Sequence, residues 1–179
     1  MVYIPSGTEL LNPTEILKKV GVSEGMKVAD MGCGSSGHFV FPAAHMVGEK
    51  GRVYGVDILK SALAGIESRR KMEGLTNVET VWSDIEIYKG TKIADGSIDI
   101  VLLVNNQPKE AMLKESARLV KNGGKLVIVD WEKIAAPFGP PTKDRLDKEE
   151  TKKMVAGLGL SFSEEFKAGP YHFGLVFVK

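Results

Sequence analysis

The chain has 179 residues, 43% of them hydrophobic, which is enough to bury the core of one globular domain over residues 1–179. Its 24 basic and 23 acidic side chains nearly cancel, so the strongly basic surface of a dedicated nucleic-acid binder is missing and we expect no nucleic acid partner. A single cysteine, Cys33, excludes an internal disulfide and indicates a reducing, cytoplasmic location. No segment approaches the roughly 18 apolar residues of a membrane span, and no apolar leader opens the chain, so we expect no membrane association.

The first half of the chain alternates helices and strands. Asn12, followed by Pro13 and Glu15, is a helix-start signal and predicts a helix that ends near residue 20. The elements expected after it are a strand over 27–31, a helix over 37–47, a strand over 52–56, a helix over 60–73 and a strand over 78–82.

The second half continues this alternation and then departs from it. The elements expected here are a strand over 98–104, a helix over 108–121 capped by the glycines of 122–124, a strand over 125–130, a helix from Asp147 to 156, and strands over 161–167 and 172–179. Only four residues separate the last two strands, too few for a parallel crossover, so they must form an antiparallel hairpin. The pattern predicts an α/β fold with a Rossmann-like, doubly wound, seven-stranded sheet, mostly parallel with an antiparallel C-terminal hairpin.

A glycine-rich segment follows the first expected strand. Residues 28–37 read VADMGCGSSG, in which Gly32, Gly34 and Gly37 let the backbone turn tightly, approach a ligand and open a helix with free amides. Asp57 ends the next strand and can accept hydrogen bonds from two ribose hydroxyls. Because this glycine spacing fits dinucleotide enzymes equally well, it predicts a nucleoside-type ligand without choosing one.

Several motifs together resemble the class I S-adenosylmethionine-dependent methyltransferases over nearly the whole chain. The glycine loop, with Asp30 before it, resembles the first motif of that family. Residues 82–85 (WSDI) resemble its segment after the third strand, and residues 117–126 resemble its R-x-L-K-P-G-G-x-L stretch, with Asn122 in place of proline. Residues 130–146 resemble a subset of small methyltransferases of the type 11 group.

The resemblance implies S-adenosylmethionine as the cofactor and gives roles to individual residues. Asp57 would bind the ribose hydroxyls, Asp84 the adenine amino group, and the amide of Ile85 a ring nitrogen. Asp30 would hold loop amides or the methionine amino group, and Asn105 would contact cofactor or substrate. The implied cofactor-binding set is Asp30, Gly32, Cys33, Gly34, Gly37, Asp57, Ile58, Asp84, Ile85 and Asn105.

The sequence shows no catalytic triad. The sulfonium of the implied cofactor carries its own activation, so methyl transfer needs a positioned nucleophile rather than a triad. His172, beside Tyr171 at the hairpin turn, is the weak candidate for a general base. His38, His45 and His172 lie apart from one another, so we expect no metal site. We interpret Cys33 as a small packing residue rather than a nucleophile.

We therefore expect methyl transfer to a small-molecule acceptor. A protein or RNA methyltransferase, an inactive cofactor-binding subunit and a nicotinamide oxidoreductase are the alternatives. Residues 105–108 (NNQP) lack the adjacent prolines and aromatic of the N-P-P-Y motif, which speaks against a DNA adenine or glutamine acceptor. We expect the loops at 3–11 and 135–143 to close over the site, with Phe138 as an apolar wall. The alternatives are a second subunit in a homodimer, or a bulky acceptor that covers the open site itself.

Overall fold

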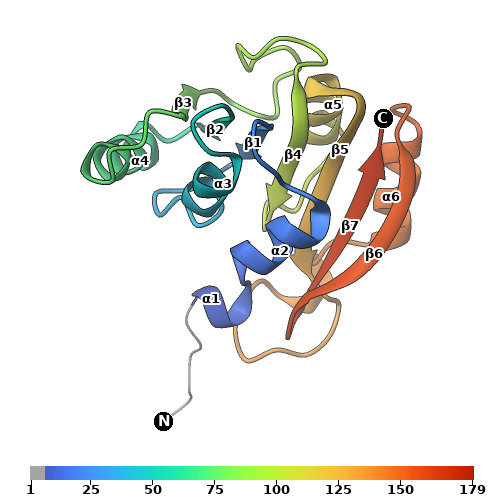
Figure 1. Ribbon diagram of the computed structural model, residues 1–179. Coiled ribbons are helices and arrows are strands. Elements are labelled where there is room, and N and C mark those ends of the chain that lie inside the picture. Colours follow the sequence, from blue (N-terminus) through green and yellow to red (C-terminus); the bar gives the residue numbers. More distant parts are fainter. Residues whose placement is uncertain (1–6) are drawn as a thin grey trace.

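A seven-stranded sheet runs through the centre of the computed structural model, which describes residues 7–179 (Figure 1). The strands are β1 (Lys27–Met31), β2 (Arg52–Asp57), β3 (Val78–Trp82), β4 (Ile98–Val104), β5 (Val120–Trp131), β6 (Ser161–Gly169) and β7 (His172–Val178). They lie in the order β3-β2-β1-β4-β5-β7-β6. The first five strands of this order pair in parallel, whereas β7 pairs antiparallel with both β5 and β6. The expected mostly parallel sheet with a reversed C-terminal hairpin is confirmed.

Helices cover both faces of the sheet. They are α1 (Gly7–Leu10), α2 (Pro13–Val20), α3 (Val40–Val47), α4 (Lys60–Met72), α5 (Glu110–Leu119) and α6 (Lys148–Ala156), with a short 3-10 helix η1 (Thr142–Asp144). Leu17, Phe41 and Ile66 bring α2, α3 and α4 into the core on one face, while Leu113 and Val155 bring α5 and α6 into the core on the other. Burial of both faces explains the long apolar runs in the inner strands β4 and β7.

Both predicted helix starts are confirmed by their caps. The side chain of Asn12 accepts a hydrogen bond from the amide of Glu15 at 3.2 Å, ahead of α2. Asp147 accepts from the amides of Glu149 and Glu150 at 3.0 and 3.1 Å, ahead of α6. In each case a side chain replaces a hydrogen-bond partner that the first helical turn lacks.

The first crossover helix begins later than predicted. Helix α3 starts at Val40 rather than at Gly37, and residues 35–39 form turns. Gly37 has a φ of +56°, in the left-handed region, whereas a right-handed helix needs a φ of about −63°. The glycine loop therefore turns the chain before the helix and does not open it.

The boundary between α5 and β5 also differs from the prediction. The helix ends at Leu119, and β5 takes up Val120, which pairs with Ile98 at the start of β4. Gly123 does adopt the left-handed conformation, with a φ of +76°, but it lies inside β5 and donates its amide to the carbonyl of Lys179. These glycines therefore accommodate an irregularity in a strand and do not cap a helix.

Part of the expected closing segment at 3–11 lies outside the described residues, since the structure describes the chain from residue 7 onward. Within that range, α1 and the connection between β5 and α6 lie at the same end of the sheet (Figure 1). No helix among residues 7–179 is long and apolar enough to span a membrane.

A buried ion pair fixes the long connection between β3 and β4. Glu115 on α5 is fully buried and accepts hydrogen bonds from the amides of Lys89 and Thr91 at 2.7 and 3.0 Å. The guanidinium of Arg118 donates to both oxygens of Glu115, at 2.6 and 2.9 Å, and also pairs with Asp95. Burial favours the protonated acid, but these donors outweigh it and hold the pKa of Glu115 below its usual value.

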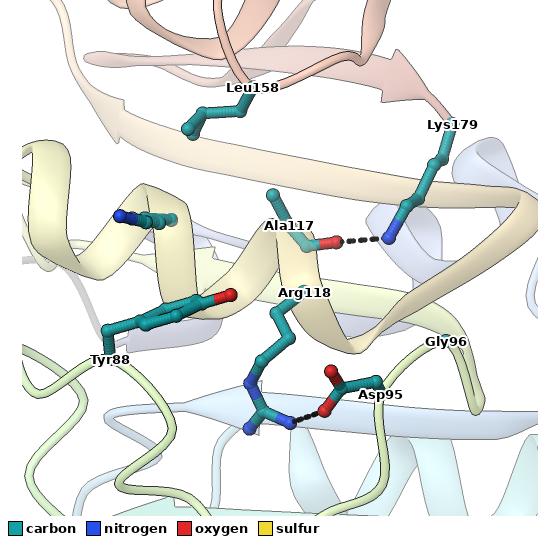
Figure 2. A pocket seen from close by; sticks show the side chains of 8 residues that line it. Tyr88, Asp95, Gly96, Ala117, Arg118, Leu158 and Lys179 are labelled. Atoms are coloured by element: carbon teal, nitrogen blue, oxygen red, sulfur yellow. Dashed lines mark hydrogen bonds and ion pairs between the residues drawn. The ribbon is translucent and has the colours of Figure 1, made fainter.

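A cavity of about 470 Å³ lies beside this ion pair (Figure 2). Gly96 precedes β4 and Lys179 follows β7, so the cavity lies at the opposite edge of the sheet from the carboxyl ends of the parallel strands. Figure 2 shows Arg118 directed toward Asp95, and the ammonium of Lys179 directed toward the main-chain oxygen of Ala117, to which it donates at 2.8 Å. Arg118 and Lys179 are therefore already paired with groups of the protein.

Removing the buried carboxylate should destabilise the protein strongly. We expect Glu115→Ala to lower the free energy of unfolding by about 3 kcal/mol or more, because it leaves the largely buried Arg118 and two loop amides without their acceptor. Urea denaturation measures the change. Glu110→Ala, at the exposed start of the same helix, is the control and should cost less than about 1 kcal/mol. Equal losses for the two variants would contradict the structural role of Glu115.

Candidate functional site

Two cavities that share Gly32 lie where the carboxyl ends of β1, β2, β3 and β4 converge. The larger, about 410 Å³, is lined by Gly32, Asp57, Ile58, Ser83, Asp84, Ile85, Glu86, Asn106 and Met112. The smaller, about 140 Å³, is lined by Leu11, Asp30, Gly32, Cys33, His38, Phe39, Val104 and Asn105. Of the ten residues predicted to bind the cofactor, all but Gly34 and Gly37 border one of these cavities. An open parallel sheet binds its ligands at this edge.

Asp57 ties the glycine loop to the end of β2. One carboxylate oxygen, Oδ2, accepts from the amide of Gly34 at 2.9 Å, and the other, Oδ1, accepts from the amide of Leu59 at 2.9 Å. The side chain is buried, with 7% exposed, and borders the larger cavity. A carboxylate offers about four acceptor positions, so Asp57 can hold both loops and still accept hydrogen bonds from a ligand.

The three glycines of the loop differ in their surroundings. Gly32, at a φ of +74°, has no room for a Cβ because the amide of Asn106 lies there. A Cβ on Gly37 would come within 2.6 Å of Phe41 and Ile66. A Cβ on Gly34 would meet no heavy atom of residues 7–179 within 4 Å. Gly32 therefore borders the cavities, whereas Gly37 allows the loop to pack on the core.

Asp84 and Ile85 border the far end of the larger cavity. Asp84 caps the turn that follows β3, since its Oδ1 accepts from the amide of Glu86 at 2.9 Å. The indole of Trp82 donates to the carbonyl of Ile58 at 2.8 Å and joins the ends of β2 and β3. Asp84 thus caps a turn and also lines the larger cavity, so the two interpretations that the sequence allowed are compatible.

Asp30 places a buried carboxyl group in the smaller cavity. Only 3% of the residue is exposed, and burial, with a smaller contribution from the charge of Asp57, raises its pKa to about 7. The Cys33 thiol lies nearby, and burial, together with Asp30 and Asp57, raises its pKa as well. Cys33 therefore stays protonated at neutral pH, which supports its interpretation as a packing residue.

The loop after β4 presents Asn105 and Asn106, the two asparagines that the resemblance implies at the methyl-transfer position, although only Asn105 was included in the expected cofactor-binding set. Asn105 and Gln107 have φ values of +55° and +48°, and the buried carboxylate of Asp130 accepts from the amide of Gln107 at 2.9 Å. Between them, Asn106 packs against Gly32, and its buried Oδ1 has no hydrogen-bond partner within the described part of the chain. Asn105 borders the smaller cavity and Asn106 the larger. The strained backbone of this loop determines which asparagine borders which cavity, and the spacing of residues in the sequence does not show that.

His172 is not brought together with the predicted cofactor residues. It begins β7 opposite Trp131, the last residue of β5, and borders neither of the two cavities. Burial, and to a lesser extent the charge of Arg145, lower its pKa to about 4, so the imidazole is neutral at physiological pH. So low a pKa makes it a weak base.

Arg145 fixes the connection after β5. Its guanidinium donates to the carbonyls of Pro140 and Glu132 at 2.9 Å and of Ile134 at 2.6 Å, and lies 5.2 Å from the ring of Trp131. Phe138, the expected apolar wall, packs edge-on against this tryptophan. The segment expected to close over the site is thus held in place by a buried arginine, but none of residues 135–143 lines either of the two cavities.

Among residues 7–179, no group of three or more His, Cys, Asp or Glu side chains is placed to hold a metal ion.

Comparison with known proteins shows that this chain shares its fold with methyltransferases. A family model described as a methyltransferase domain matches residues 22–163. A crystal structure of an S-adenosylmethionine-dependent methyltransferase from Aquifex aeolicus has a TM-score of 0.86 and 28% sequence identity, and the match covers 97% of this chain and 93% of that one.

Curated relatives are similar over part of their length. An arsenite methyltransferase of Aquipseudomonas alcaligenes is 35% identical over 115 residues, which cover 60% of this chain and 33% of the relative. A ubiquinone/menaquinone biosynthesis C-methyltransferase of Shewanella piezotolerans is 33% identical over 122 residues, covering 65% and 47% respectively. The matches therefore span between a third and a half of these relatives.

Alanine substitutions should distinguish Gly37, which packs on the core, from Gly34, which has open space around it. Gly34→Ala should cost about 1 kcal/mol of folding stability, because a side chain there meets only the backbone preference against a positive φ. Gly37→Ala should cost about 2 kcal/mol more, because its Cβ also collides with Phe41 and Ile66. Urea denaturation of both variants tests the difference, and similar losses would refute the packing role of Gly37.

Proposed function

Because the chain belongs to the family of S-adenosylmethionine-dependent methyltransferase domains, we propose that it transfers a methyl group to a nucleophile on a small-molecule acceptor. The observation that carries the proposal is the pair of cavities that meet at Gly32, one bordered by Asp57 and Asp84 and the other by the buried Asp30. The likeness to the Aquifex aeolicus enzyme extends over almost the whole of both chains.

The larger cavity suits the nucleoside half of the cofactor. Asp57 accepts from the ribose hydroxyls, with Ile58 beside it against the base. Asp84 accepts from the adenine amino group, and the amide of Ile85 donates to a ring nitrogen. The support is chemical, because both carboxylates border one cavity of about 410 Å³, a volume ordinary for a small-molecule site.

The smaller cavity suits the amino-acid half. A buried carboxyl such as Asp30 needs a cationic or hydrogen-bonding partner, and the ammonium of the cofactor supplies one. Gly32, Cys33 and Asn105 border the same space. Asn106 joins the proposed contacts, because its buried and unpartnered Oδ1 can accept a hydrogen bond where the two cavities meet.

When bound, S-adenosylmethionine supplies a methyl group already activated on its sulfonium. The protein then has to hold the cofactor, exclude water and present the acceptor in line, and such positioning provides most of the acceleration. The fixed loop from Asn105 to Gln107 suits this task, because it does not have to be ordered at the moment of reaction.

A small acceptor is favoured over a macromolecule by two observations. The net charge of +1 gives no long-range attraction for a nucleic acid. The curated relatives are named for arsenite and for quinone biosynthesis, both small-molecule chemistries.

Cofactor binding should depend on pH through Asp30. The ligand ammonium favours the ionised carboxylate, whose pKa in the free protein is about 7, so binding below that pH must release a proton. We expect the affinity for S-adenosylhomocysteine to rise as the pH increases from about 5 to about 7 and then to level off. Calorimetry in buffers of different ionisation enthalpy measures the released proton. Asp30→Asn should remove the pH dependence, and its persistence in that variant would contradict the assignment.

Methyl transfer itself can be followed with methyl-labelled S-adenosylmethionine in a cell extract, separated afterwards into metabolite, RNA and protein fractions. We expect label in the metabolite fraction, and its loss in the Asp57→Ala variant, because cofactor affinity falls without the ribose acceptor. Label confined to RNA or protein would refute the small-molecule acceptor.

A further inference from the structure

The loop after β4 lies where the two proposed cofactor cavities meet. Asn105 borders the cavity of Asp30, whereas Asn106 borders the cavity of Asp57 and packs against Gly32, the residue that both cavities share. The position of this loop therefore determines which groups of the protein a ligand meets at the junction.

Gln107 is the residue of this loop whose backbone is most strained. Its φ is +48°, in the left-handed region that a residue with a long side chain rarely adopts. Pro108 follows it, and a residue that precedes proline is restricted further, toward extended conformations with a negative φ. A free chain would leave this conformation, so a contact elsewhere in the fold must hold Gln107 in place.

The end of β5, which lies beside β4 in the sheet, provides this contact (Figure 1). The main-chain oxygen of Val129 accepts from the amide of Asn105 at 2.9 Å, and Oδ2 of Asp130 accepts from the amide of Gln107 at 2.9 Å. These two hydrogen bonds flank Asn106. The first continues the pairing of β4 with β5, whereas the second depends on a side chain.

Asp130 is itself held rigidly. The residue is completely buried, and its other carboxylate oxygen, Oδ1, accepts from the amide of Trp131 at 2.8 Å. Within the described part of the chain, no cation pairs with this carboxylate, and it lines neither cofactor cavity. A buried carboxylate without a cation is costly, and the contact that it makes to another segment is the one to the loop after β4.

We propose that Asp130 is a positioning residue of the cofactor site, which accepts the amide of Gln107 and thereby holds the side chain of Asn106 against Gly32, in contact with the bound cofactor. Without the carboxylate, Gln107 returns to a negative φ and Asn106 moves away from the junction of the cavities. The proposal rests on the proposed function, since it takes S-adenosylmethionine as the ligand of these cavities.

A double-mutant cycle on the affinity for S-adenosylhomocysteine, measured by calorimetry, tests this role. Asp130→Leu removes both acceptor oxygens and keeps a branched side chain of the same shape. We expect it to weaken binding about fivefold, because the amide of Gln107 loses its acceptor and the contact of Asn106 is lost with it. Asn106→Ala removes that contact directly and should weaken binding by a similar factor. The double variant should lose no more than either single variant, since both changes remove the same contact.

Asp99→Leu is the matched control. Asp99 also accepts from a main-chain amide, that of Lys27 at 2.7 Å, but it lies near the start of β4, at the opposite edge of the sheet. Loss of this carboxylate should leave the affinity for S-adenosylhomocysteine unchanged. All variants are compared at a temperature at which circular dichroism shows them folded, so that weaker binding does not reflect unfolding.

The absence of a further loss in the double variant is the result that a merely structural role of Asp130 would not produce. The proposal is overturned if Asp130→Leu binds as tightly as the unmodified protein, if the losses of the single variants multiply, or if Asp99→Leu loses as much. An unchanged affinity of Asn106→Ala would also overturn it, because Asp130 would have no contact to act through. The proposed function fails in a different way, by an unmodified protein that does not bind S-adenosylhomocysteine at all.

Discussion

One carboxylate, that of Asp57, holds together the two loops that border the proposed cofactor site. It accepts from the amide of Gly34 in the loop after β1 and from the amide of Leu59 in the loop after β2. The loops are in this way fixed relative to each other before any ligand binds, which lowers the cost of ordering them on binding. The same side chain borders the larger cavity, so the group that organises the site is also the one proposed to recognise the ribose.

Buried polar side chains gather at the end of the sheet where the parallel strands have their carboxyl ends. Asp30, Asp130 and His172 are buried there, and in each case burial shifts the pKa toward the neutral form. Asn105 and Gln107 add backbone strain at the same edge. Buried polar groups and strain that persist together are typical of a site that a ligand completes. The ion pair of Glu115 at the opposite edge, by contrast, is fully satisfied and serves the fold.

The sequence predicted what depends on local pattern. Strand ends locate Asp57 and Asp84, and the short spacing after residue 167 forces the antiparallel hairpin. It could not predict what depends on long-range contacts or on the sign of a backbone angle. Pairing of Val120 with Ile98 ends α5 early, and the positive φ of Gly37 delays α3. For the same reason the sequence could place Asn105 and Asn106 together at the end of β4 but could not tell which cavity each of them borders.

The direct test of the account is the affinity of S-adenosylhomocysteine compared with its 2′,3′-dideoxy analogue, measured by calorimetry. For the unmodified protein, we expect the analogue to bind about tenfold more weakly or worse, because the hydrogen bonds to a charged carboxylate are lost. For Asp57→Ala, the two ligands should bind alike. Equal binding of both ligands to the unmodified protein, or discrimination that survives in the variant, would contradict the assignment of Asp57 and with it the proposed cofactor site.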